Sequence, residues 1–214
     1  MKVLITGTSK GIGKATAELF LIRGHFVIGI DKEWSTIDHP LYEHRRYDID
    51  LFLPDISGVE VLINNAGVQN TGHDIRTNLE SLIKVTEKYG IQPSIKSIVN
   101  VASTSAHNGA EFPEYCASKR GVLAYTKNVA LRVAQVGATC NSISPGGVTT
   151  EMNDHIIQNP ELWRAVMAET LIPKWASAEE IAEWIYFVAA VNKSMTGQDI
   201  IIDNGELSNF NFVW

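Results

Sequence analysis

A tyrosine and a lysine four residues apart, Tyr115 and Lys119, form the pair that points most directly to chemistry. Residues at positions i and i+4 share one face of a helix, so the phenol and the ammonium would project side by side. A free phenol loses its proton near pH ~10, and a fixed positive charge beside it lowers that pKa. Such a tyrosine can exchange a proton with an alcohol or a carbonyl near neutral pH. The same spacing also occurs on solvated helix faces, so the pair needs support from the rest of the chain.

A glycine-rich segment, Thr6 to Gly13, lies between a short apolar run and a helical pattern near the start of the chain. Glycines here allow a tight turn and a close approach of the backbone to a pyrophosphate, while the helix N-terminus offers N–H groups and a positive dipole end. The alternative is a loop that merely needs small residues, but the strand–turn–helix context favours a dinucleotide site. The residues predicted to contact the cofactor here are Gly7, Ser9, Lys10, Gly11, Ile12 and Gly13.

Acidic residues after the second and third predicted strands bear on which dinucleotide is bound. Asp31 could accept hydrogen bonds from both ribose hydroxyls and would repel a 2′-phosphate, which favours NAD over NADP. Lys10 and Lys32 could attract that phosphate, so NADP remains the less favoured alternative. Asp48 could accept from the adenine amine while the backbone at Ile49 meets the ring, although a turn or cap role for Asp48 explains its position nearly as well.

Short apolar runs alternate with amphipathic stretches along the chain, which predicts βαβ units and a parallel sheet. The expected strands are residues 3–5, 26–30, 45–47, 61–63, 97–101, 139–143 and 199–202. Helices are expected over residues 12–23, 78–88, 113–136 and 178–191, and the interval 48–58 has room for a turn or two at most. The pattern predicts one α/β domain over residues 1–214, a doubly wound parallel sheet of about seven strands with helices on both faces.

Composition excludes several classes of function. The 214 residues carry a net charge of −6 and no Lys/Arg block, so we expect neither a nucleic-acid partner nor an anionic membrane surface. No signal peptide or membrane span is visible in the sequence. Cys116 and Cys140 are the two cysteines, and without a secretion signal they are expected to be reduced thiols of a cytoplasmic protein. We expect no metal site.

Several segments in chain order carry related motifs. They are the T-G-x-x-x-G-x-G turn from Thr6, Asn64-Asn65-Ala66-Gly67, Asn78, Ser103, Tyr115 with Lys119, and Pro145-Gly146-Gly147-Val148-Thr149-Thr150. Together they resemble the short-chain dehydrogenase/reductase superfamily, in its small single-domain branch, along essentially the whole chain. The resemblance implies a Rossmann-like fold and an NAD(P)-dependent oxidoreductase. The intervals between Gly67 and Asn78 and around the third helix are shorter than is usual in that family, which puts the substrate class in doubt.

The resemblance also implies a role for each matching residue. Tyr115 would be the acid/base, Ser103 would hold the substrate oxygen, and Lys119 would lower the pKa of the tyrosine and bind the nicotinamide ribose. Asn78 would help to anchor a proton-relay water. Ser105, two residues after Ser103, is the weaker candidate for the serine. Further cofactor contacts are implied for Asn65, Ala66, Gly67, Pro145, Val148 and Thr150, together with Tyr115 and Lys119.

The sequence therefore predicts an oxidoreductase that transfers hydride between NAD(H) and a small alcohol or ketone. The alternatives are an NADPH-dependent 3-oxoacyl-thioester reductase of the acyl carrier protein type and a non-catalytic nucleotide-sensing protein. Residues 151–174 are expected to form either a mobile lid or a fixed packing helix over the substrate. The resemblance implies a homodimer or homotetramer, and the apolar tail 210–214 is predicted to pack on the body or on a neighbouring subunit.

Overall fold

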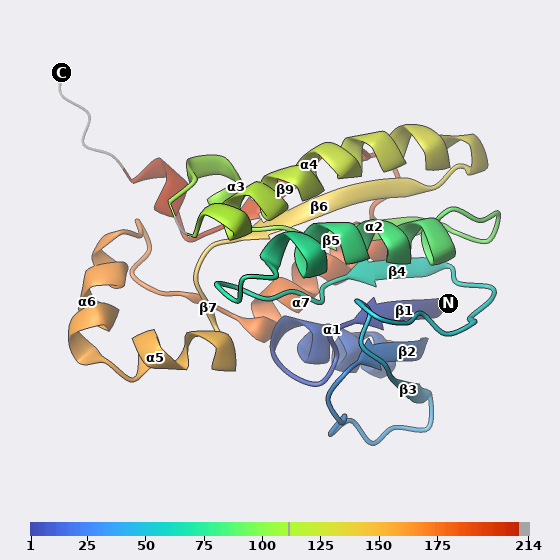
Figure 1. Cartoon of the computed structure of the whole chain (residues 1–214), viewed down its shortest axis with the longest axis horizontal. Helices are drawn as coiled ribbons and strands as arrows, with labels where there is room; N and C mark the ends of the chain where they lie inside the picture. Colours follow the sequence, from blue (N-terminus) through green and yellow to red (C-terminus); the bar gives the residue numbers. More distant parts are fainter. Residues whose placement is uncertain (111, 210–214) are drawn as a thin grey trace.

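A seven-stranded parallel sheet forms the centre of the molecule in the computed structural model, which describes residues 1–110 and 112–209 (Figure 1). Its strands, in spatial order, are β3 (Tyr42–Arg46), β2 (Phe26–Asp31), β1 (Lys2–Thr6), β4 (Val61–Asn64), β5 (Ser97–Val101), β6 (Thr139–Pro145) and β9 (Asp199–Ile202). All neighbouring strands run parallel. The strand order reverses between β1 and β4, and ligands of such sheets bind in the crevice at the carboxyl ends of the strands there.

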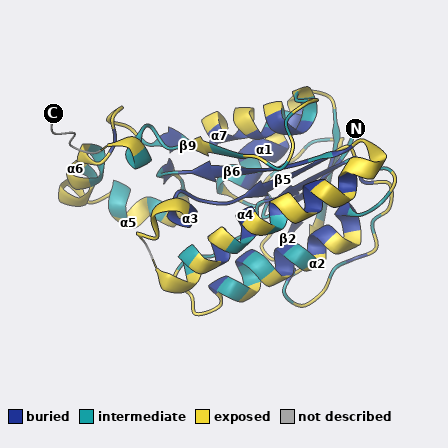
Figure 2. Ribbon diagram, turned by 90° about the horizontal axis from the view of Figure 1, so that it is seen from above, coloured by how far each residue is buried: buried dark blue, intermediate teal, exposed yellow. Residues whose placement is uncertain are grey.

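Helices cover both faces of this sheet (Figure 2). On one face α1 (Gly11–Ile22) packs against α7 (Ala178–Tyr186), which continues into η5 (Phe187–Val191). The other face carries a helix made of η1 (Arg76–Ser81), α2 (Leu82–Val85) and η2 (Thr86–Gly90). Beside it lies α4 (Pro113–Val133), continued by η3 (Ala134–Val136). The predicted doubly wound α/β fold is thus confirmed.

The core consists of two apolar layers, one on each side of the sheet. Successive side chains of β1 point to opposite faces, as a strand requires: Val3 and Ile5 join the cluster under α1 and α7, and Leu4 joins the cluster under α4. All three are fully buried. Because both faces are covered, the central strands appear in the sequence as unbroken apolar runs.

Strand boundaries differ from expectation at the edge of the sheet. β3 begins at Tyr42, three residues before the predicted start at Arg45, and ends at Arg46. It is an edge strand, and within the described part of the chain its one partner is β2, so its sequence YEHRR has no apolar run to mark it. A second, two-stranded sheet of β7 (Val148–Thr149) and β8 (Ala176–Ser177) was not predicted.

The segment between β7 and β8 stands away from the core. It contains η4 (Glu151–Asn153), α5 (Asp154–Ile157) and α6 (Pro160–Ala168), and none of the residues in these three elements is buried. Trp163 of α6 packs edge-on against Trp175, with 5.3 Å between the ring centroids. The alternative between lid and fixed helix stays a prediction, and the expected packing of the tail 210–214 falls outside the described residues.

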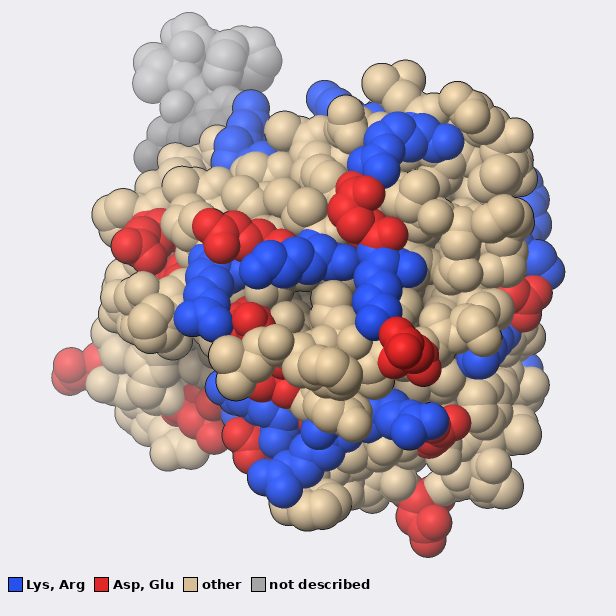
Figure 3. Space-filling model, turned by 45° about the vertical axis from the view of Figure 1, so that its right-hand side comes forward, with Lys and Arg blue, Asp and Glu red and all other residues tan. Residues whose placement is uncertain are grey.

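Among the described residues, the helices are all too short or too polar to span a membrane. Within the same residues, three or more His, Cys, Asp or Glu side chains nowhere gather in a way that could hold a metal ion. Lys/Arg and Asp/Glu side chains lie interleaved on the face shown in Figure 3, without a large patch of one sign.

Candidate active site

Three elements bring the predicted catalytic residues to the carboxyl end of β5. Ser103 follows β5 by two residues. Pro113 occupies the first turn of α4, where its fixed φ suits a helix start, and that start places Tyr115 and Lys119 on the first two turns. Asn78 comes from η1 on the same face of the sheet.

Lys119 is the fixed point of this group. Its side chain is buried, with 5% of the residue exposed, and its Nζ donates a hydrogen bond of 2.9 Å to the carbonyl oxygen of Val101 at the end of β5. The same nitrogen lies 5.6 Å from the centroid of the Tyr115 ring. The ammonium and the phenol therefore share one helix face, as the spacing predicts. A positive charge held at this distance favours the phenolate.

Ser103 is buried beside a second serine. The Ser103 Oγ lies 3.0 Å from the Ser105 Oγ and accepts a hydrogen bond from the Ser105 backbone N–H at 3.2 Å. The two hydroxyls thus form one polar group at the end of β5. Their closeness leaves both serines near the reaction centre, so the preference for Ser103 stays a prediction.

Asn78 lies beside Lys119, and its side-chain amide bonds two neighbouring segments. Its Oδ1 accepts from the Val68 N–H at 2.8 Å, and its Nδ2 donates to the Val68 carbonyl at 2.8 Å and to the Ser118 Oγ at 3.1 Å. A Cβ added to Gly67 would lie 3.1 Å from the Asn78 Oδ1 and 3.5 Å from the Lys119 Nζ. Hydrogen bonds of Asn78 therefore connect three segments around Lys119: the loop that follows β4, the helix η1 and the helix α4. Sequence reasoning missed Ser118 as a partner of Asn78, because nothing in the local sequence distinguishes this helical serine from one that faces solvent.

The glycine-rich turn has the shape that a dinucleotide needs. Gly7 and Gly11 have positive φ values of +75° and +56°, which favour glycine. A Cβ on Gly13 would lie 1.9 Å from the Gly7 carbonyl oxygen, so α1 approaches the turn as closely as a hydrogen-only residue allows. α1 begins with no side-chain cap and no acidic residue in its first turn. The N–H groups of this helix start therefore have no capping side chain at the N-cap, and a pyrophosphate bound there would supply acceptors for them.

Hydrogen bonds between the end of β1 and the residues that follow β4 hold this turn in place. The buried Thr6 Oγ1 accepts hydrogen bonds from the N–H groups of Asn65 and Ala66, both at 3.1 Å. The Asn65 side chain donates to the carbonyl oxygens of Thr6 and Gly7, each at 3.0 Å. Asn65 and Ala66 therefore shape the wall of the predicted site, whereas their direct contact with a cofactor stays a prediction.

Asp31 lies at the end of β2 next to this turn. One carboxylate oxygen accepts the Ser9 N–H and the other accepts the Glu33 N–H, both at 2.9 Å. A carboxylate offers about four lone-pair sites, so two remain for ribose hydroxyls. Arg46 is the register partner of Asp31 on β3, and its guanidinium stacks 4.4 Å from the Trp34 ring centroid.

The loop after β6 closes the opposite side of the crevice. Val148 is buried, and a Cβ on Gly147 would lie 2.1 Å from the Trp175 indole. A Cβ on Gly11 would lie 3.4 Å from the Thr150 Cγ2, so this loop and the glycine-rich turn meet. Pro145 ends β6 at the same edge of the sheet. These residues lie at the carboxyl edge of the sheet, between the glycine-rich turn and the end of β6, where dinucleotides bind in folds of this kind.

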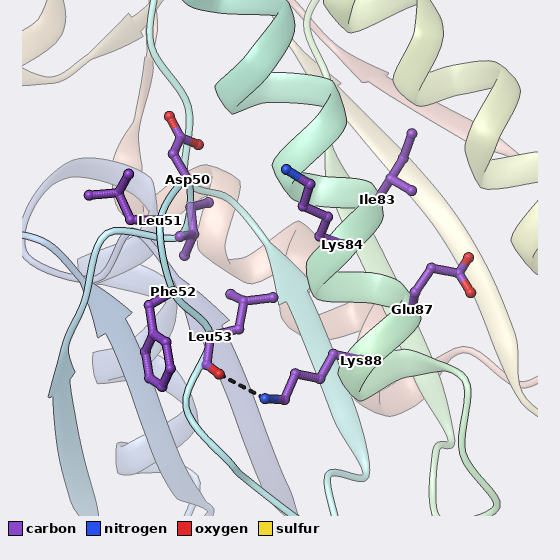
Figure 4. Close-up of a pocket in the computed structure, with 9 residues that line it drawn as sticks. Asp50, Leu51, Phe52, Leu53, Ile83, Lys84, Glu87 and Lys88 are labelled. Atoms are coloured by element: carbon purple, nitrogen blue, oxygen red, sulfur yellow. Dashed lines mark hydrogen bonds between the residues drawn. The ribbon is translucent and has the colours of Figure 1, made fainter.

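Asp48 and Ile49 lie further out along the same edge. The Asp48 Oδ1 accepts the Asp50 N–H at 2.9 Å, which is the geometry of a turn, and Ile49 is buried. A hollow of about 650 Å³ opens between residues 49–53 and 83–88 on this flank (Figure 4). None of the predicted catalytic residues lines it. The predicted acid/base residues, Tyr115 and Lys119, lie at the end of β5 instead, and their catalytic role stays a prediction.

This chain is similar to known proteins along most of its length. A family profile described as Enoyl-(Acyl carrier protein) reductase matches residues 52–206. The short chain dehydrogenase adrF of Penicillium rubens is 30% identical, with 94% of this chain and 95% of that protein aligned. The 3-oxoacyl-(acyl-carrier-protein) reductase FabG of Vibrio cholerae is 29% identical over 94% of this chain and 95% of its own length. A solved short chain dehydrogenase family protein from Francisella tularensis superposes with a TM-score of 0.84 at 26% identity, covering 97% of this chain and 99% of that one.

The chain belongs to the short-chain dehydrogenase/reductase family. The family resemblance seen in the sequence is confirmed, and so is the expected class of enzyme. This short-chain dehydrogenase/reductase is an oxidoreductase that uses a nicotinamide dinucleotide and acts on alcohol or carbonyl groups.

Proposed function

We propose that this short-chain dehydrogenase/reductase interconverts a small alcohol and its ketone with NAD(H), using Tyr115 as the general acid/base. The observation that carries the proposal is the buried Lys119 ammonium, hydrogen-bonded to the end of β5 and 5.6 Å from the Tyr115 ring centroid. A buried cation is costly unless it is compensated, and a developing phenolate beside it supplies compensation. The site is thus built to stabilise the deprotonated phenol.

The protein's own part in the reaction is to position the substrate and to manage one proton. When bound, the nicotinamide ring supplies or accepts the hydride. In the oxidation direction the Tyr115 phenolate would take the hydroxyl proton of the alcohol, and in reduction the phenol would return it to the carbonyl oxygen. Ser103 would donate a hydrogen bond to the same oxygen, holding it near the phenol. Asn78 would keep the loop at Gly67 in place around the lysine.

Asp31 supports NAD as the preferred dinucleotide. Its carboxylate lies at the ribose end of the crevice, and it would repel a 2′-phosphate. Two cations nearby would instead attract a 2′-phosphate and so favour NADP. They are Arg46, the register partner of Asp31, and Lys10 in the glycine-rich turn. The test is the ratio of kcat/KM for NADH to that for NADPH, measured also in Asp31→Ser. We expect wild type to prefer NADH and the variant to lose most of that preference; a clear preference of wild type for NADPH would contradict the proposal.

The test of the catalytic assignment is Tyr115→Phe, which removes only the hydroxyl. A panel of alcohols and ketones is screened first by the absorbance of the reduced cofactor. General acid–base groups contribute about 10²–10⁴-fold to rate, so we expect kcat to fall by that factor with little change in cofactor affinity. The matched control is Tyr125→Phe on the same helix, whose hydroxyl bonds Glu87 at 2.9 Å. Full turnover by Tyr115→Phe would show that the phenol is not the acid/base.

An NADPH-dependent 3-oxoacyl-thioester reductase is the second candidate. The similarity to FabG of Vibrio cholerae over nearly the whole chain favours it, and Asp31 opposes it. Acetoacetyl thioesters in the substrate panel distinguish the two: efficient reduction with NADPH would establish the second candidate. A purely nucleotide-sensing protein has no use for Ser103, Tyr115 and Lys119 at one site.

The segment 151–174 has features that favour a partly apolar substrate and a role as a movable lid. No residue of α5 or α6 is buried, while Met152 and Leu162 are exposed apolar side chains of this segment. Segments with few buried contacts have low local stability, and active-site lids are typically such segments. We infer that residues 151–174 close over the bound substrate.

We also propose that the protein is a homodimer or homotetramer of a reducing, cytoplasmic compartment. Both cysteines are free thiols. Leu131 on α4 is 77% exposed, and Trp184 of α7 and Phe187 of η5 form a second exposed apolar surface, with 6.3 Å between their ring centroids. Such patches mark contacts with other chains. Light scattering of Leu131→Glu and Phe187→Glu tests this: a smaller assembly than wild type supports it, and a monomeric wild type would contradict it.

A further inference from the structure

A closed set of hydrogen bonds joins the glycine-rich turn to the loop after β2 and to β3. The Thr8 Oγ1 lies 2.9 Å from the Tyr42 hydroxyl, which lies 3.1 Å from the His44 Nδ1. The His44 Nε2 lies 2.9 Å from the Glu33 carbonyl oxygen, which also accepts from the Ser9 Oγ at 3.2 Å. Because Ser9 follows Thr8 in the chain, these five residues form a ring, called here the turn ring.

Hydrogen-bonding chemistry fixes the direction of the bonds in the turn ring. A carbonyl oxygen only accepts, so the His44 Nε2 must carry a proton and donate to Glu33. When Nε2 carries the ring's one proton, the Nδ1 accepts from the Tyr42 hydroxyl, and the Tyr42 oxygen then accepts from the Thr8 hydroxyl. Each hydroxyl and each imidazole nitrogen of the turn ring thus has a hydrogen-bond partner.

Sequence and strand geometry make the turn ring possible. Tyr42 and His44 are two residues apart on β3, so their side chains lie on the same face of the sheet. Gly29 of β2 leaves room beneath them: a Cβ there would lie 2.3 Å from both the Thr8 Oγ1 and the Tyr42 hydroxyl. Thr8 is fully buried, so without Tyr42 its hydroxyl would lose this partner away from solvent.

The turn ring surrounds the predicted ribose end of the cofactor site. Asp31 accepts the N–H of Ser9 and the N–H of Glu33, both at 2.9 Å, and these are two members of the ring. The position of the carboxylate therefore depends on the same residues that Tyr42 and His44 hold. Ser9 also lies between Gly7 and Gly11, in the part of the turn that a pyrophosphate would meet.

We propose that Tyr42 and His44 are positioning residues for the dinucleotide, which hold the glycine-rich turn and the Asp31 carboxylate in the binding geometry before the cofactor arrives. The inference rests on the proposed function in requiring that a dinucleotide binds here. Neither residue touches the reacting atoms, which lie at β5 and α4. A site whose competent geometry is populated only part of the time binds with proportionally lower apparent affinity.

The experiment compares Tyr42→Phe and Thr8→Val with wild type. NADH and NADPH dissociation constants are measured by fluorescence titration, and amide hydrogen exchange is followed in the cofactor-free protein. We expect the dissociation constant to rise about 3- to 30-fold and exchange to accelerate at residues 7–11 and 31–35. The KM for cofactor should rise in parallel, while kcat at saturating cofactor stays within about twofold of wild type.

Three further variants distinguish positioning from a general loss of structure. Thr8→Ser keeps the hydroxyl and should restore most of the affinity lost in Thr8→Val. Because both Thr8→Val and Tyr42→Phe break the same bond, their double variant should weaken binding by less than the product of the single effects. Tyr186→Phe is the matched control. It also removes a tyrosine hydroxyl near a histidine, 3.4 Å from the His25 Nε2, but this pair lies away from the predicted cofactor site. Should Tyr42→Phe fail to fold, Thr8→Val carries the same test.

The outcomes separate this inference from the proposed function. Wild-type binding of a dinucleotide with unchanged constants in Tyr42→Phe and Thr8→Val would overturn the positioning role alone. A fall in kcat without a change in binding, or fully multiplicative effects in the double variant, would also overturn it. A wild type that binds neither NADH nor NADPH would overturn both proposals.

Discussion

Adding a single methyl group at Gly13 tests how closely α1 must approach the glycine-rich turn. A Cβ at this position would lie 1.9 Å from the Gly7 carbonyl oxygen and 2.3 Å from the Asn65 Nδ2, whereas ordinary contact begins at 3.4 Å. Gly7 cannot retreat, because its N–H bonds the Ile30 carbonyl at 2.8 Å and its own Cβ position lies 2.9 Å from the Ala66 Cα. In Gly13→Ala either the helix must move off the sheet or the turn must open.

The expected magnitude follows from three contributions. Overpacking costs about 1–3 kcal/mol, and loss of the two Asn65 side-chain hydrogen bonds costs about 1 kcal/mol each. Alanine returns about 1 kcal/mol through its higher helix propensity. The free energy of unfolding should therefore fall by about 2–4 kcal/mol, which corresponds to a decrease in Tm of roughly 5–15 °C for a chain of this size.

Thermal unfolding by circular dichroism and titration with NADH together measure the effect of Gly13→Ala. We expect the lower Tm and at least a tenfold weaker dinucleotide affinity, since the turn that receives the pyrophosphate is displaced. Lys14→Ala on the next residue is the control and should stay within about 0.5 kcal/mol of wild type. Asn65→Ala combined with Gly13→Ala should not restore stability, because the clash with the Gly7 carbonyl remains. A Tm equal to or above that of wild type would refute the close approach of α1.

Three further outcomes follow from the structure. Burial raises the pKa of the Cys140 thiol to about 12, so Ellman's reagent at pH 8 should label the half-buried Cys116 rapidly and Cys140 only on unfolding; equal native rates would contradict this. A bidentate hydrogen bond from Arg132 lowers the pKa of Glu87. Both side chains are partly exposed, so Arg132→Ala should lower the free energy of unfolding by about 0.5 kcal/mol at pH 7. Because the pair stabilises the carboxylate form of Glu87, this difference between variant and wild type should shrink as pH falls below 4.5. A difference that does not change with pH would contradict the pairing. Trp175 packs on the loop after β6, so Trp175→Phe should remove most of the tryptophan quenching that NADH causes, and undiminished quenching would place that signal elsewhere.

Local sequence patterns were enough to predict the fold and to nominate most residues of the candidate site, because both signals are short-range. Unbroken apolar runs marked the covered strands, and the glycines between β1 and α1 marked a turn that side chains would block. The four-residue spacing of Tyr115 and Lys119 placed the two groups on one helix face without any tertiary information.

Tertiary structure alone determined what surrounds those residues. The acceptor of the Lys119 ammonium is the carbonyl of Val101, on a strand that only the packing of α4 against the sheet brings near. The turn ring through Tyr42 and Thr8 joins positions 34 residues apart on a polar edge strand that has no periodic signal. Hydrogen bonds between distant segments have no spacing rule, because the sheet register that aligns them is set by the whole core and not by the neighbouring sequence.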